Sequence, residues 1–264
     1  MKAAIARRVP GRLLPALAAA LTSLAPAPVR AGRSPFAWVH ATEVVPERSV
    51  ELETWILEEN GVADSGQESD PAGDVPDLTA LWWSTVLGIT DRIEISLPIE
   101  IRHLQTGATG GSTILYGYGA ELRWRLVSPD PVEAGRFAPQ LRAGVHRLIN
   151  ARNRTRSDAG FALGVDLAPR VHAAADIGAT WIAGSGKPFF ELTPAAGVGI
   201  LVFDQLSVGA ELIAEITLRG DETDWLAAGP SVAWTHGRFW IAAALPIGII
   251  DIRTAPRVNW AVAF

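Results

Sequence analysis

Cysteine is absent from the 264-residue chain. This absence excludes disulfide bonds, thiolate metal sites and cysteine nucleophiles. Charged residues are also scarce, at 19% of the chain, and the net charge of -5 with a pI near 5.6 does not indicate a nucleic-acid partner. Long apolar runs are missing after the first 31 residues, so no later segment is suited to a membrane-spanning helix, which needs about 20 apolar residues.

The first 31 residues have the pattern of a secretory signal peptide. Lys2, Arg7 and Arg8 precede the short apolar run LLPALAAALTSLA (13 to 25), and Val29-Arg30-Ala31 fits a small-residue cleavage site. The alternative is a buried helix of a cytosolic protein. We expect a cleaved signal peptide over residues 1–31, a short segment over 32–47 and one domain over 48–264.

From residue 48 onward apolar residues recur with a period of two, which is typical of strands with two different faces. About twelve strands are expected. They cover residues 48–58, 78–90, 92–104, 112–127, 136–149, 157–168, 170–183, 188–203, 206–219, 225–236, 238–250 and 258–264. The joints alternate between tight ones, such as Asp204-Gln205, and longer ones, such as 60–77, with the long joint SPDPVEAG (128 to 135) as the exception.

The stretch RIEISLPIEIRHL (92 to 104) separates a row of aliphatic residues from a row of charges. One parity holds Ile93, Ile95, Leu97, Ile99 and Ile101, and the other holds Arg92, Glu94, Ser96, Glu100 and Arg102. Two further strands repeat the pattern, with outward rows predicted at Ile114, Tyr116, Tyr118, Leu122 and Trp124 and at Leu206, Val208, Leu212, Ile216 and Leu218. A sheet that closes in a bilayer presents its apolar face to lipid and its polar face to an interior lumen.

These patterns predict an all-β fold, a closed antiparallel transmembrane up-and-down β-barrel of about 12 strands. Aromatic residues near the strand ends predict two girdles at the membrane interfaces. One girdle would contain Trp82, Trp83, Trp181, Phe190 and Trp225, and the other Trp124, Phe137, Phe203, Trp234 and Phe239.

The chain ends on VNWAVAF, in which Val258, Trp260, Val262 and Phe264 share one parity. The sequence resembles the Gram-negative outer-membrane β-barrel class in three features: this last strand, the regular alternation of strands with short and long joints, and the signal peptide. The resemblance implies an integral outer-membrane location, both termini and the segment 32–47 in the periplasm, and recognition of the last strand by the barrel-assembly machinery. ATEVVPERSVELETW (41 to 55) also resembles transporter-like, porin-like barrels encoded near catabolic pathways.

Charged residues on the inward parity are the candidates for a lumen constriction. They are Arg123, Arg125, Arg142, His146, Glu51, Glu53, Glu94, Glu100, Glu211 and Glu215. Facing basic and acidic walls would favour small polar or charged solutes, whereas a closed network would neutralise the charges. Small residues occupy other inward positions, namely Ala195, Gly197, Gly199, Gly209, Ala227, Gly229 and Ser231, and leave space for a pore or for a plug formed by residues 33–47.

A passive channel for small hydrophilic solutes is the function that this interior favours. An outer-membrane lipase or protease is a second hypothesis, with Asp166 and His172 as an oriented base, but GxSxG is absent and we predict no catalytic residues. A plugged structural or surface-binding barrel is the third, in which the acidic stretch 58–77 binds divalent cations. That stretch lacks the spacing of a calcium loop, and we predict neither a metal site nor a cofactor.

Overall fold

The structure is a computed structural model that describes residues 35–62, 77–106, 110–128, 137–149, 153–184 and 186–264. Its strands are β1 (Val50–Glu59), β2 (Asp77–Thr90), β3 (Ile93–Thr106), β4 (Gly110–Arg125), β5 (Phe137–Leu148), β6 (Arg154–Ala168), β7 (Val171–Gly184), β8 (Phe189–Phe203), β9 (Leu206–Arg219), β10 (Trp225–His236), β11 (Phe239–Ala244), β12 (Ile247–Ile250) and β13 (Arg257–Ala263). Within the described ranges, the structure contains no helix of the length and apolarity needed to cross a membrane.

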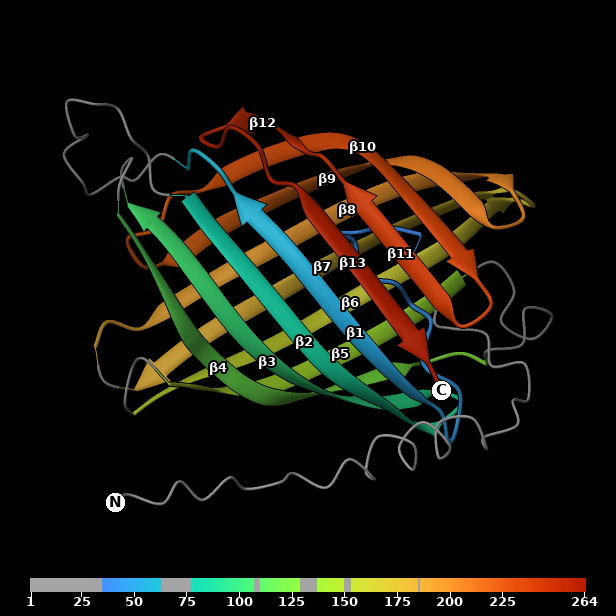
Figure 1. Ribbon diagram of the computed structural model, residues 1–264, viewed down its shortest axis with the longest axis horizontal. Helices are drawn as coiled ribbons and strands as arrows, with labels where there is room; N and C mark the ends of the chain where they lie inside the picture. The colour runs from blue at the N-terminus through green and yellow to red at the C-terminus, as the bar shows by residue number, and fades with distance from the viewer. Residues whose placement is uncertain (1–34, 63–76, 107–109, 129–136, 150–152, 185) are drawn as a thin grey trace, which may run out of the picture.

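Every strand pairs antiparallel with its neighbours, and the barrel closes where β1 pairs with β13 (Figure 1). β1 pairs with β13, β13 pairs with β11, and β11 pairs with β10. β11 and β12 both pair with β10 and are separated only by Leu245-Pro246, so together they take the place of one strand. The thirteen segments therefore form a closed barrel of 12 strands. The single strand predicted over 238–250 is therefore interrupted, at a proline that has no N–H to donate to the ladder.

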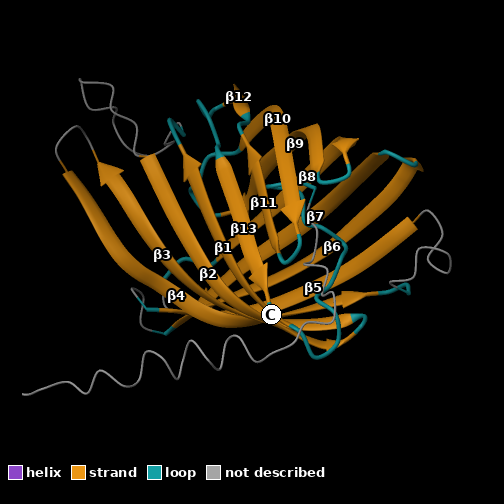
Figure 2. Ribbon diagram, turned by 45° about the vertical axis from the view of Figure 1, so that its right-hand side comes forward, coloured by secondary structure: helices purple, strands orange, loops and turns teal. Residues whose placement is uncertain are grey.

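The two ends of the barrel carry connections of different length. The turn rim has the start of β1, the end of β13 and the joints at 91–92, 126–136, 169–170, 204–205 and 237–238. The loop rim has the joints at 60–76, 107–109, 149–153, 185–188, 220–224 and 251–256. In Figure 2 the C-terminus marks the turn rim at the bottom, and β12 lies at the loop rim at the top. The predicted alternation is confirmed, including the long exception between β4 and β5.

The two faces of the strands differ as the sequence predicts. On β3, Glu94 and Glu100 are buried in the interior, while Leu97 and Ile99 are exposed on the outer surface. On β9, Glu211 is buried and Leu212 is exposed. Successive side chains of a strand point to opposite faces, so a shift of one residue would place buried carboxylates on the apolar exterior. The register of the barrel is therefore strongly specified.

Two predictions of side-chain direction are wrong. A β-bulge in the β3–β4 pairing pairs Ile101 with Leu115, so that Ile114 and Tyr116 face the interior and Leu115 faces outward. A bulge inserts one residue and thereby reverses the parity on one side of it. Trp82 and Trp225 also line the interior instead of joining a girdle. The outer surface does carry exposed aromatic residues near the rims, at Trp181, Trp124, Phe137, Phe203 and Trp234. Trp83, which was predicted for a girdle, is exposed on the outer surface but lies halfway along β2.

Candidate functional site

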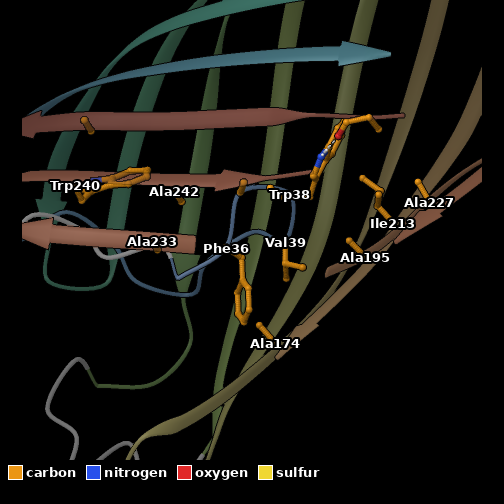
Figure 3. Close-up of a cluster of buried hydrophobic side chains, with 14 of the residues drawn as sticks. Phe36, Trp38, Val39, Ala174, Ala195, Ile213, Ala227, Ala233, Trp240 and Ala242 are labelled. Atoms are coloured by element: carbon orange, nitrogen blue, oxygen red, sulfur yellow. Dashed lines mark hydrogen bonds between the residues drawn. The ribbon is translucent and has the colours of Figure 1, made fainter. Parts of the chain in front are cut away.

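The interior of the barrel contains the segment that precedes β1. Residues 35–47, which we call the plug, fold into the lumen near the turn rim, and Phe36, Trp38 and Val39 are buried there (Figure 3). Their neighbours on the wall are small, and an added Cβ at Gly197 would lie 2.8 Å from the Phe36 ring. A Cβ added at Gly199 would lie 3.6 Å from the same ring. Of the two alternatives for the small inward residues, the structure shows the plug.

Carboxylates of the barrel wall bind the backbone of the plug. The Glu211 carboxylate on β9 accepts hydrogen bonds from the backbone N–H groups of Ala37 (2.9 Å), Trp38 (2.6 Å) and Val39 (3.0 Å). Glu94 on β3 accepts one from Val45 at 2.5 Å. Buried backbone N–H groups need partners, and charged acceptors provide the strongest ones. Glu211 and Glu94, predicted as candidates for a lumen constriction, thus hold the plug in place.

Other wall residues bind the plug through single contacts. Asp176 accepts a hydrogen bond from the His40 N–H at 3.4 Å, and Asn259 donates one to the Ala37 carbonyl at 2.6 Å. The Arg142 guanidinium hydrogen bonds to the His40 imidazole. Asp176 and Asn259 were not among the predicted site residues, because a polar residue on the inward parity has no sequence signal that separates a plug contact from a lumen charge.

The predicted basic residues of the lumen are paired with carboxylates. Arg123 forms ion pairs with Glu94 (3.0 Å), Glu121 (2.6 Å) and Glu53 (3.8 Å), and all four side chains are at least 87% buried. Arg142 pairs with Asp176 at 3.4 Å. Charges with this little exposure are stable only when they are paired and hydrogen-bonded. Of the two predicted arrangements, the structure around Arg123 has the closed network.

The remaining predicted lumen residues are distributed along the wall. His146 contacts Asp158 at 3.0 Å, and the Glu51 carboxylate accepts a hydrogen bond from Trp240 Nε1 at 3.0 Å. Glu100 forms ion pairs with Arg102 and Arg156. Glu215 lines the cavity of about 640 Å³ that is described below. Arg125 lies at the turn-rim end of β4, and its buried Nε has no hydrogen-bond partner among the described residues.

The last strand has the predicted parity. Val262 and Phe264 are exposed on the outer surface, whereas Asn259, Ala261 and Ala263 are buried in the interior. Val258 and Trp260 lie on the same parity as Val262 and are half-buried. The recognition of this strand by an assembly machinery stays a prediction.

Two cavities lie on opposite sides of the plug. The larger has a volume of about 640 Å³, extends from the loop rim, and has Trp38 and His40 of the plug at its inner end. The smaller has a volume of about 240 Å³, lies at the turn rim, and is lined by Pro35 and Glu43 of the plug. The plug therefore lies between these two cavities.

The residues considered for catalysis and for metal binding do not form such sites in the described structure. His172 Nδ1 lies 2.8 Å from Asp166 Oδ1 at the turn rim, as predicted. Within the described ranges, no serine or threonine hydroxyl hydrogen bonds to His172, and no group of three or more His, Asp or Glu side chains is arranged to hold a metal ion. Most of the acidic stretch, residues 63–76, lies outside the described residues.

Comparison with known proteins gives similarity in structure but not in sequence. No family model and no curated protein matches the chain. Among solved structures, the COG4313 outer membrane channel from Pseudomonas putida F1 superposes with a TM-score of 0.59 at 11% identity, covering 84% of this chain and 98% of that one. The fold is that of an outer-membrane β-barrel.

Two further structures support this assignment of the fold. The β domain of the Bordetella autotransporter BrkA has a TM-score of 0.54 at 10% identity and covers 82% of this chain and 99% of its own. The NanC porin has a TM-score of 0.50 at 9% identity and covers 81% of this chain and 98% of its own. At these identities the similarity concerns the fold alone.

Proposed function

We propose that this outer-membrane β-barrel is a passive channel for small hydrophilic solutes and that the plug holds its closed state. The two cavities on either side of the plug carry the proposal. The backbone N–H groups of the plug donate to wall carboxylates, and water or another donor can replace these N–H groups, because a charged acceptor interacts well with either. The turn rim and both chain ends face the periplasm in this arrangement, and the loop rim faces outward.

Solute flux into proteoliposomes tests the proposal directly. A chain that lacks residues 35–47 is expected to admit small neutral sugars and ions, while the unmodified chain admits them more slowly, because the plug lies between the two cavities. Larger oligosaccharides should be excluded by both chains, since a 12-stranded barrel is narrower than a 16-stranded porin. Absence of flux through the truncated barrel would favour the plugged structural barrel over the channel.

The pH dependence of opening follows from His40. Desolvation in the lumen, together with the guanidinium groups of Arg142, Arg123 and Arg257, holds the pKa of the His40 imidazole well below its ordinary value of 6.5. The plugged state therefore binds fewer protons than a released plug in water. Its stabilisation by neutral His40 is complete above pH 6.5 and is lost as the pH falls below that value.

We expect the open fraction of the channel to rise as the pH is lowered from 7 to 5, values on either side of the ordinary His40 pKa. Single-channel recording at fixed salt measures this fraction. His40→Gln keeps a neutral acceptor beside Arg142 and should make opening less dependent on pH. The charged groups that face His40 are Arg142, Arg123, Arg257 and Asp176, and an unchanged pH profile in His40→Gln would show that the titration of His40 does not open the channel.

A further inference from the structure

The larger cavity has an excess of acidic residues on its wall. Nine Asp and Glu side chains line it against four Arg side chains. Toward the loop rim, Glu59 of β1, Glu191 of β8 and Glu215 of β9 face this space from separate strands. Carboxylates that share a confined space repel one another, and this repulsion is relieved when a proton or a cation binds between them.

Glu191 is the member of this group that indicates a ligand. Its side chain is buried, with only 9% of the residue exposed, and it lines the cavity. It has no hydrogen bond or ion pair in the described structure, in contrast to Glu94, which is 2% exposed and pairs with Arg123 at 3.0 Å. A buried carboxylate needs a partner, and the cavity is the space from which one can reach Glu191.

The arginines of the same cavity already have partners. Arg102 pairs with Glu100 at 2.5 Å and lies 3.7 Å from the centre of the Tyr116 ring. Arg156 pairs with Asp158 at 2.8 Å and with Glu100 at 3.5 Å. Among the described residues, neither guanidinium group forms an ion pair with Glu59, Glu191 or Glu215.

Apolar and aromatic surface adjoins the free carboxylate. Phe189 lies two residues before Glu191 on β8 and lines the same cavity. Trp225 is 2% exposed and donates its Nε1–H to Glu215 at 2.9 Å. A carboxylate beside aromatic rings recognises an ammonium group through charge pairing and cation–π contact. The volume of about 640 Å³ is within the range of sites for small organic molecules.

We infer that the larger cavity is a binding site for small organic cations, namely ammonium compounds that carry an apolar or aromatic group. Glu191, Glu215 and Glu59 are the anionic partners of the ammonium group. The inference deepens the proposed function, because this cavity is the outer part of the same lumen. It concerns binding to the plugged barrel and does not require that solute crosses it.

Isothermal titration of the full mature chain in detergent tests the site with three probes of one shape. Phenethylammonium carries a positive charge, phenylethanol is neutral and phenylacetate is negative. We expect phenethylammonium to bind at least about tenfold more tightly than the other two, and its affinity to fall as salt is raised. Glu191→Gln keeps the shape of the side chain and should weaken phenethylammonium binding by about 10- to 100-fold.

Glu47→Gln is the matched control, because it removes an exposed carboxylate at the turn rim and should leave binding unchanged. Far-UV circular dichroism establishes that each variant keeps its β structure, and Glu215→Gln gives a second, independent test. Equal binding of phenylethanol, or binding of Mg²⁺ without binding of phenethylammonium, would overturn the inference. Titration reports on the site even if flux experiments reject the channel, so the two proposals can fail separately.

Discussion

Replacement of Glu211 by alanine is expected to release the plug and to convert the closed barrel into a conducting one. The variant removes the carboxylate that accepts three plug N–H groups and leaves those groups without a partner in the lumen. Hydrogen bonds to charged groups contribute about 1.5–3 kcal/mol each and are not additive within one network, so a loss of about 3–5 kcal/mol is expected. The equilibrium between plugged and open states should shift by about 10²- to 10⁴-fold.

Planar-bilayer recording measures the open fraction, and thiol labelling measures the position of the plug. Because the chain has no cysteine, Val39→Cys provides a single thiol, which is buried in the plugged state and reacts when the plug leaves. Glu211→Gln should have an intermediate effect, since an amide oxygen is a weaker acceptor than a carboxylate. Lys187→Ala is the control, because its ion pair with Asp221 lies at the loop rim, away from the plug.

Gly197→Val provides an independent route to the same open state. The nearest atoms to an added Cβ at this position belong to the plug side chains Phe36 and Val39, at 2.8 and 3.2 Å, so the larger residue displaces the plug without a clash in the barrel backbone. Ala210→Val also introduces a valine, but on the outer face of β9, and should leave the plug in place. If neither Glu211→Ala nor Gly197→Val raises labelling or conductance, the plug is a permanent part of the barrel.

Leu212→Arg, one residue along β9 from Glu211, is expected to destabilise the whole barrel. Leu212 lies halfway along the strand and is 44% exposed on the outer face, so an arginine there enters the hydrocarbon layer. An arginine near the midplane costs about 2–4 kcal/mol, and one near the interface costs about 0–1 kcal/mol. The loss should appear in the free energy of unfolding by denaturant in lipid, followed by tryptophan fluorescence.

Leu218→Arg tests the dependence on depth, because Leu218 shares the outer face of β9 but lies near the loop rim. Its effect should be no more than about 1 kcal/mol. Similar losses for Leu212→Arg and Leu218→Arg would indicate that β9 does not cross the hydrocarbon layer as the fold requires. Substitutions at two adjacent residues thus test two different properties. Changes at Glu211 test how firmly the plug is held, and changes at Leu212 test the stability of the barrel in lipid.

The strands and the closed barrel follow from the sequence because lipid imposes a strict rule on side chains. Charged residues such as Glu94 and Glu211 must face inward wherever Leu97 and Leu212 face outward, and a period of two is visible without any structure. The rule fails at Tyr116, where a bulge reverses the parity and the sequence contains no signal of the inserted residue. It also fails at Trp225, because tryptophan is as common in buried cores as at interfaces.

The contacts of the lumen could be predicted only in part. Inward parity identifies Arg123 and Arg142 as interior residues, but their partners depend on the shear of the barrel and on the plug, which bring Asp176 and His40 to Arg142. Residues 33–47 were available to fill the space beside Gly197. The bonds from Ala37, Trp38 and Val39 to Glu211 connect residues more than 170 positions apart and have no local pattern.

The position of the plug next to β1 also has a consequence for assembly. β1 and β13 are the first and last strands that the structure describes, and the seam between them closes the barrel. The plug is tethered directly to β1 and hydrogen bonds to Asn259 of β13 and to Glu211 of β9. Closure of the seam therefore also brings Asn259 to the plug, which is covalently attached to β1.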